Sequence, residues 1–160
     1  MGERYVASAC VVVILLLEAL GISAQQPRST SNPPLNTEMP TEVILGAPIY
    51  PTAQFLGSYD VGREQKIYLF GTDASFGQMV GYYHQRLDER GDRVFDTPAT
   101  HQFDTERFND DRMNYRPSVT IKDYSSSGSL GYLHPSLSGN ATRFVTLIQI
   151  VTAPPEEPRR

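Results

Sequence analysis

Prolines are distributed unevenly along this chain of 160 residues, and their positions limit how much of it can pack into one domain. Six of the twelve prolines fall between positions 27 and 51, and three fall between 154 and 158. Proline fixes φ and cannot donate a backbone hydrogen bond, so regular structure is expected in the proline-poor region between these runs. We therefore predict a single domain over residues 43–152, a size that can fold without a metal or a disulfide.

The first 24 residues have the pattern of a signal peptide. Residues 6–17 (VASACVVVILLL) form an apolar run, and Glu18 ends it before it can comfortably cross about 30 Å of hydrocarbon. Small residues follow, so cleavage is expected between Ala24 and Gln25. The alternative is an uncleaved single-pass anchor over residues 5–24. The prediction is export to the periplasm or the extracellular space, with membrane contact only during export or through this anchor.

Two segments of biased composition flank the predicted domain. Residues 25–42 (QQPRSTSNPPLNTEMPTE) are rich in Pro, Ser and Asn and contain few apolar side chains, which predicts a flexible spacer. Residues 153–160 (APPEEPRR) predict a disordered tail for the same reason.

Charge and cysteine content exclude several classes of function. The formal net charge is −4, and the chain has no run of Lys or Arg. Such a run would be needed to displace the counterions around the phosphates of a nucleic acid, so nucleic acid is not an expected partner. The single cysteine, Cys10, lies inside the apolar run, so the exported part has no thiol for a disulfide, for catalysis or for metal ligation. A small exported domain without disulfides favours a bacterial envelope protein.

The pattern over residues 43–152 predicts an α+β fold, with a small, mostly antiparallel sheet and one main helix packed on one face. Residues 53–59 and 65–72 predict two strands and a tight turn, and hence a hairpin. Residues 144–151 (FVTLIQIV) are the most apolar and β-branched segment, which predicts a central strand. Further strands are expected at residues 93–95, 100–103 and 118–124.

One helix is predicted over residues 75–90. Its apolar positions recur at helical spacing and form one stripe, consisting of Phe76, Met79, Val80, Tyr83 and Leu87. Ser75 and Gln78 have the spacing of a capping box, with Asp73 as the alternative N-cap. Gly91 suits the left-handed position that follows a helix.

A Ser- and Gly-rich connection of eighteen residues, 125–142, has no predicted element. Structureless connections longer than about 12–15 residues are uncommon in compact domains, so this one is either a binding loop or a loosely pinned insertion. Tyr124, Tyr132 and His134 accompany it and are candidate binding residues. Aromatic side chains beside small residues occur in recognition loops and also as anchors that hold a loop on its own sheet, and the pattern favours the anchor.

Three histidines invite a metal-site interpretation, and their spacing argues against it. No two of His84, His101 and His134 have the separation that puts two imidazoles on one helical face. No metal or other cofactor is therefore predicted. His101 lies close to a predicted turn and is the fourth candidate binding residue.

Catalytic motifs are likewise not recognisable. The serines at 125–127 lack a G-x-S-x-G elbow, and the acidic residues at 104–111 lack the spacing and central glycine of a calcium loop. The acidic segment predicts a solvated, locally ion-paired face. Gly57, Gly62 and Gly71 indicate bulges and turns, because they do not form a phosphate-binding pattern. No catalytic residue is predicted.

The order of segments resembles an uncharacterised family of small exported bacterial proteins. The resemblance rests on a Tyr-Pro-x-Ala start at residues 50–53 and on residues 66–92 (KIYLFGTDASFGQMVGYYHQRLDERGD), where two strands precede a helix. Residues 117–133 and 143–151 are similar as well, so it covers about residues 49–152. No activity is established for that family, so the resemblance transfers no functional residues.

These observations predict an exported protein that binds a protein or small-molecule partner in the envelope, or has a structural role, without catalysis. An extracytoplasmic enzyme that uses histidine and carboxylate chemistry is the first alternative. A domain anchored by an uncleaved N-terminal segment is the second.

Overall fold

A computed structural model describes residues 38–87, 93–96, 99–134 and 141–156. The predictions for the signal peptide, its cleavage site and the spacer up to residue 37 lie outside the described residues. Within the described part, no helix is long and apolar enough to span a membrane.

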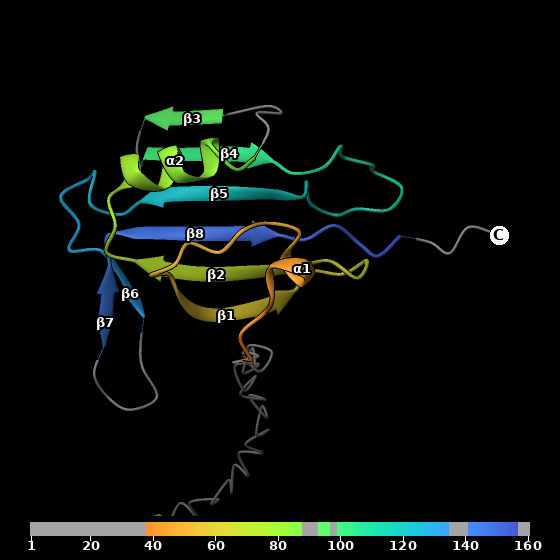
Figure 1. Ribbon diagram of the computed structural model, residues 1–160, viewed down its shortest axis with the longest axis horizontal. Coiled ribbons are helices and arrows are strands. Elements are labelled where there is room, and N and C mark those ends of the chain that lie inside the picture. Colours follow the sequence, from red (N-terminus) through yellow and green to blue (C-terminus); the bar gives the residue numbers. More distant parts are fainter. Residues whose placement is uncertain (1–37, 88–92, 97–98, 135–140, 157–160) are drawn as a thin grey trace, which may run out of the picture. The chain divides into compact units, whose positions relative to one another are not determined.

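The described chain forms a six-stranded sheet, a separate two-stranded sheet and two helices (Figure 1). All pairings within the large sheet are antiparallel, and the strand order is β1-β2-β8-β5-β4-β3. The predicted α+β class is therefore confirmed. The strands of this sheet are β1 (Gln54–Asp60), β2 (Lys66–Thr72), β3 (Arg93–Asp96), β4 (Ala99–Asp104), β5 (Ser118–Asp123) and β8 (Thr146–Val151).

Two predicted features of the sheet are confirmed. β1 and β2 form the expected hairpin, and a shift in register between Phe55 and Gly57 marks a β-bulge at one of the predicted bulge glycines. β8 lies in the centre, between β2 and β5. Its side chains are buried on both faces, with Ile148 on one face and Leu147 on the other. This explains why the segment is almost continuously apolar.

The main helix, α2 (Phe76–His84), begins as predicted and ends earlier. The Ser75 side chain accepts from the Gln78 N–H, and the Gln78 side chain accepts from the Ser75 N–H, which completes the capping box. The predicted end at Arg90 is wrong, because the N–H groups of Arg86 and Leu87 both donate to the Tyr83 carbonyl in a tight last turn. Residues 88–92 lie outside the described residues.

The predicted loop over residues 125–142 contains secondary structure. β6 (Tyr132–His134) and β7 (Thr142–Phe144) pair antiparallel and leave the large sheet at a steep angle (Figure 1). The predicted last strand is also divided, because Val145 separates β7 from β8 and its carbonyl accepts from the Tyr124 N–H. Three-residue strands are too short to show an alternating pattern, which is why the sequence did not reveal this hairpin.

A short helix, α1 (Glu42–Leu45), starts where the spacer was predicted to end. Thr41 caps it, and Gly46 ends it with a φ of 63°, a left-handed conformation that glycine adopts without strain. The Glu42 carboxylate accepts from the Ile49 N–H at 2.8 Å, which fixes the chain after the helix. This contact joins residues seven positions apart and has no signature in the sequence.

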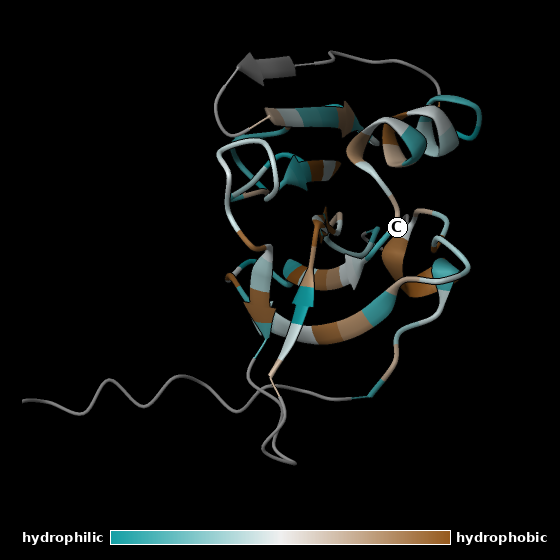
Figure 2. Ribbon diagram, turned by 90° about the vertical axis from the view of Figure 1, so that its left-hand side faces the viewer, coloured by the Kyte–Doolittle hydropathy of each residue, from teal (hydrophilic) through white to brown (hydrophobic). Residues whose placement is uncertain are grey.

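The core consists of two clusters on opposite faces of the large sheet. In Figure 2 both helices lie on the same side of this sheet, and the larger cluster fills the space beneath them. Its buried members are Leu45, Ala47, Tyr68, Phe70, Met79, Tyr83, Phe103, Val119, Ile121, Ile148 and Ile150. The smaller cluster, on the other face, contains Leu56, Phe144 and Leu147, with Leu69, Tyr124 and Tyr132 packed against it. The predicted helix stripe therefore faces the sheet.

Candidate functional site

The sheet face opposite α2 carries a row of hydrogen-bonding side chains. Phe103, Val119 and Ile148 point into the larger cluster, so the residues that alternate with them point away from α2. Four of these residues form what we call the polar face: Gln102, Thr120, Lys122 and Gln149. Gln149 lies opposite Thr120, and Thr120 lies opposite Gln102, so the row crosses three neighbouring strands.

The polar groups of this face are only partly engaged with one another. The Lys122 ammonium donates to the Gln149 amide oxygen at 3.4 Å. The Gln102 amide donates to Asp104 at 2.8 Å, and Asp104 also forms an ion pair with Arg116 at 2.8 Å. Gln102, Lys122 and Gln149 are half-buried, so each keeps hydrogen-bonding capacity towards solvent. Asp104 is ion-paired, as predicted for the acidic segment, but it is buried, whereas the prediction was a solvated face.

Two tyrosines, Tyr124 and Tyr132, lie at the end of the sheet where β5 finishes, and we call them the tyrosine cluster. The rings of Tyr124 and Tyr132 meet edge to face, with centroids 5.2 Å apart and planes at 70°. Burial raises the pKa of the Tyr132 hydroxyl, and the neighbouring Tyr59 and Tyr124 hydroxyls raise it further. The side chains of Tyr124 and Tyr132 are half-buried. They come from the end of β5 and from β6, so only the fold brings them together. Tyr59 of β1 is opposite Ile67, and the register places it towards the other end of the sheet, at the level of Val151 and Ser118.

Phe144 positions the hairpin that carries Tyr132. Its ring is 1% exposed and lies directly over Gly71 of β2, where an added Cβ would come within 2.9 Å of ring carbon Cδ1 and closer still to Cγ and Cδ2. The sequence suggested that Gly71 marks a bulge or a turn, and for this glycine the prediction is wrong. Gly71 lies where the Phe144 ring approaches the backbone of the strand. Because Tyr132 lies opposite Phe144 across the β6–β7 pair, this contact also fixes Tyr132 beside the sheet.

The four candidate binding residues do not form one site. Tyr124 and Tyr132 lie together, and both pack on the smaller cluster, as expected of loop anchors. His134 is two residues beyond Tyr132 on β6 and is half-buried. His101 lies on β4 with its ring 4.6 Å from that of Phe103, a buried member of the larger cluster. It is therefore on the opposite face of the sheet from the tyrosines.

The turn between β1 and β2 was predicted from the sequence, but its backbone conformation was not. Gly62, Arg63 and Glu64 have φ values of 80°, 51° and 60°, so two non-glycine residues in succession are left-handed. Gln65, which is fully buried, holds this turn in place. Its amide nitrogen donates to the carbonyls of Tyr115 and Thr152, and its amide oxygen accepts from two N–H groups, those of Asn114 and Tyr115.

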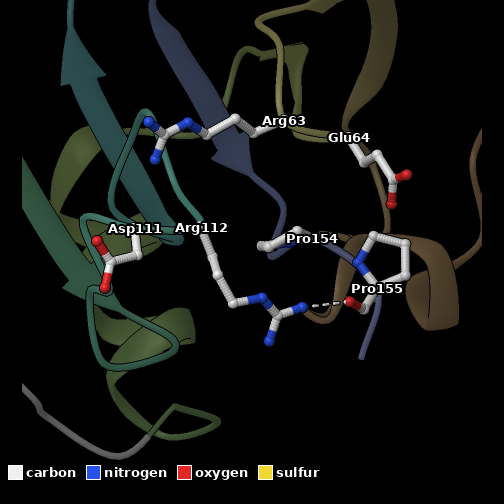
Figure 3. A pocket seen from close by; sticks show the side chains of 6 residues that line it. All are labelled: Arg63, Glu64, Asp111, Arg112, Pro154 and Pro155. Carbon is white, nitrogen blue, oxygen red and sulfur yellow. Dashed lines mark hydrogen bonds between the residues drawn. The ribbon is translucent and has the colours of Figure 1, made fainter. Parts of the chain in front are cut away.

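A shallow pocket of about 360 Å³ lies beside this turn. Its lining residues are Arg63, Glu64, Asp111, Arg112, Pro154 and Pro155. The charged ends of these side chains do not converge on one point (Figure 3). Arg63 donates to the backbone carbonyls of Asp110 and Met113, and Arg112 donates to that of Pro155 at 2.7 Å. These guanidinium groups connect separate loops through backbone carbonyls. We therefore interpret the arginines beside the pocket as structural residues.

Metal ligation finds no support in the part of the chain that the structure describes. No group of three or more His, Cys, Asp or Glu side chains lies close enough together there to hold an ion. Comparisons with known proteins find no matching protein family, no matching curated protein and no matching solved structure.

Proposed function

We propose that this chain is an exported, non-catalytic binding domain whose ligand lies on the polar face, against the tyrosine cluster. The observation that carries the proposal is the edge-to-face contact of Tyr124 and Tyr132, from two separate segments, on the sheet face that also carries a row of half-buried amide and ammonium groups. Aromatic rings supply contact area to a ligand at a low cost in conformational entropy, and polar groups beside them form hydrogen bonds that orient the ligand.

A further observation supports binding over catalysis. The ionised groups on this face are engaged with neighbours, since Asp104 pairs with Arg116 and Lys122 donates to Gln149. A general acid or base needs a titrating group directed at a substrate.

The export part of the proposal rests on the N-terminal sequence. The apolar run at residues 6–17 and the small residues before Gln25 have the features of a cleaved signal peptide. The ligand is accordingly a component that the protein meets outside the cytoplasm.

Site-specific photo-crosslinking in the producing cells tests the binding surface. A benzophenone amino acid replaces Tyr132, and in a matched control it replaces Tyr115, which is 50% exposed. Tyr115 precedes β5 and Tyr124 follows it, so the control lies at the opposite end of that strand. We expect a covalent adduct from position 132 and none from position 115. The absence of an adduct at 132, in protein that melts like the native chain, would overturn the proposal.

A further inference from the structure

Lys122 is the charged member of the polar face, and its positive charge is not neutralised within the described chain. Its ammonium group donates to the Gln149 amide oxygen, which is a neutral acceptor, and in the described part of the chain it has no ion-pair partner. The Asp104 carboxylate, which accepts from Gln102, is paired with Arg116 instead. Lys122 is half-buried and has therefore lost part of its hydration, so an incoming anion would stabilise it.

An aromatic surface begins two residues after Lys122, on the same face of β5. Lys122 lies opposite Leu147 of β8, and Tyr124 packs on the smaller cluster to which Leu147 belongs. Alternate residues of a strand are about 6.8 Å apart, and the ring of Tyr132 lies 5.2 Å from that of Tyr124. Alternate side chains of an extended peptide have the same spacing. In a peptide that lies along β5, an acidic and an apolar side chain two positions apart would therefore meet Lys122 and the tyrosine cluster together.

The glutamines of the polar face add groups that can bind a peptide backbone. Gln65 shows such binding within this structure, because its amide donates to two backbone carbonyls and accepts from two backbone N–H groups. Gln149 uses its amide oxygen for Lys122, and Gln102 uses its amide nitrogen for Asp104. The described chain engages neither the Gln149 amide nitrogen nor the Gln102 amide oxygen. These two groups can donate to a carbonyl and accept from an N–H group of a bound peptide.

Resting on the proposed binding function, we propose that the ligand is an extended acidic segment of a protein partner. In this segment an Asp or Glu side chain lies two residues from an aromatic or large aliphatic side chain. The carboxylate pairs with Lys122, the apolar side chain packs on the tyrosine cluster, and the backbone bonds to the amide groups. A peptide fits better than a small acid, because Gln102 and Gln149 lie on either side of β5, two strand intervals or about 10 Å apart.

Fluorescence anisotropy with defined peptides tests this assignment on protein purified from the producing cells. The probe is a rhodamine-labelled decapeptide of serine and glycine with blocked ends, carrying one glutamate and, two positions later, one phenylalanine. The matched peptide has glutamine in place of glutamate. In about 0.05 M salt we expect the acidic peptide to bind about tenfold more tightly than its match, and this ratio should approach one in about 0.5 M salt. Equal binding of the two peptides in low salt, or no binding of the acidic one at about 1 mM, would overturn the inference.

Variants assign the preference for the acidic peptide to one side chain. Lys122→Gln should bind both peptides with the same affinity, whereas Lys122→Arg, which keeps the charge, should retain the preference. Lys66→Gln is the matched control, because it removes the same charge from an exposed position at the other end of the sheet, and it should bind like the native protein. Tyr132→Ala should weaken both peptides severalfold and leave their ratio unchanged. An undiminished preference in Lys122→Gln would place the acidic residue elsewhere and overturn the inference.

The two proposals fail in different ways. An adduct at position 132 to a molecule that is not a protein, together with no preference for the acidic peptide, refutes the acidic-segment inference and leaves the binding surface in place. An adduct to a protein whose yield is the same in the Lys122→Gln background has the same consequence. The absence of any adduct at position 132 and of any peptide binding refutes both.

Discussion

The contact between Gly71 and Phe144 allows a stability change to be predicted with its sign and size. Replacing Gly71 by Ala puts a methyl group within 2.9 Å of the Phe144 ring, and closer to two of its carbons. The ring cannot easily give way, because it is 1% exposed and packed with Leu56 and Leu147. Overpacking of a filled core typically costs about 1–3 kcal/mol, and complete loss of a buried phenylalanine side chain about 3–5 kcal/mol. We expect Gly71→Ala to cost about 3 kcal/mol.

Denaturant titration followed by circular dichroism measures this cost, and Gly81→Ala provides a matched control. Gly81 is exposed in the middle of α2, where an added Cβ meets nothing within 4 Å. The same substitution should therefore stabilise the protein there by about 0.5–1 kcal/mol, since alanine loses less backbone entropy in a helix.

A double-mutant cycle tests the cause. Phe144→Ala should cost about 3–5 kcal/mol in the native background and clearly less in the Gly71→Ala background, because the clash has then gone. Strict additivity of the two changes, or a Gly71→Ala protein within about 0.5 kcal/mol of the native one, would refute the proposed contact.

Three further outcomes are expected. Gln65→Ala should lower the free energy of unfolding by about 3 kcal/mol or more in denaturant titration, because a fully buried side chain loses four hydrogen bonds to backbone groups. A negligible loss would contradict that role. Burial raises the pKa of Tyr83, so above about pH 10 the unfolded chain loses this proton while the folded chain keeps it. Stability should therefore fall as pH rises above 10, and Tyr83→Phe should reduce that fall. N-terminal sequencing of protein from the soluble envelope fraction should find Gln25 at the start, whereas an intact N-terminus in the membrane pellet would establish the anchor.

Some features of the fold follow from the sequence alone, because they depend on neighbours along the chain. The start of α2 is fixed by Ser75 and Gln78, three positions apart, and its buried side by apolar residues at helical spacing. The β1–β2 hairpin follows from two apolar runs and a short turn. The central place of β8 follows from an apolar run that needs cover on both faces.

The candidate site was only partly predictable. Tyr124 and Tyr132 could be selected because they accompany an unusually long connection between strands. The contact between them could not, because it forms only when the β6–β7 hairpin places Tyr132 beside the end of β5. His101 was selected from its nearness to a turn, and strand alternation, which depends on the register with β5, puts it on the other face.

Contacts between distant residues were decided by the tertiary structure. Gln65 bonds to the Thr152 carbonyl 87 residues away and to Tyr115 50 residues away, and nothing beside Gln65 in the sequence marks it as buried. Gly71 looks like any strand glycine until the Phe144 ring is placed over it. The pattern within a segment indicates which of its side chains are buried. Packing between segments decides which residue covers each of them. The surface to which we assign binding depends on this packing, and the sequence alone therefore does not locate it.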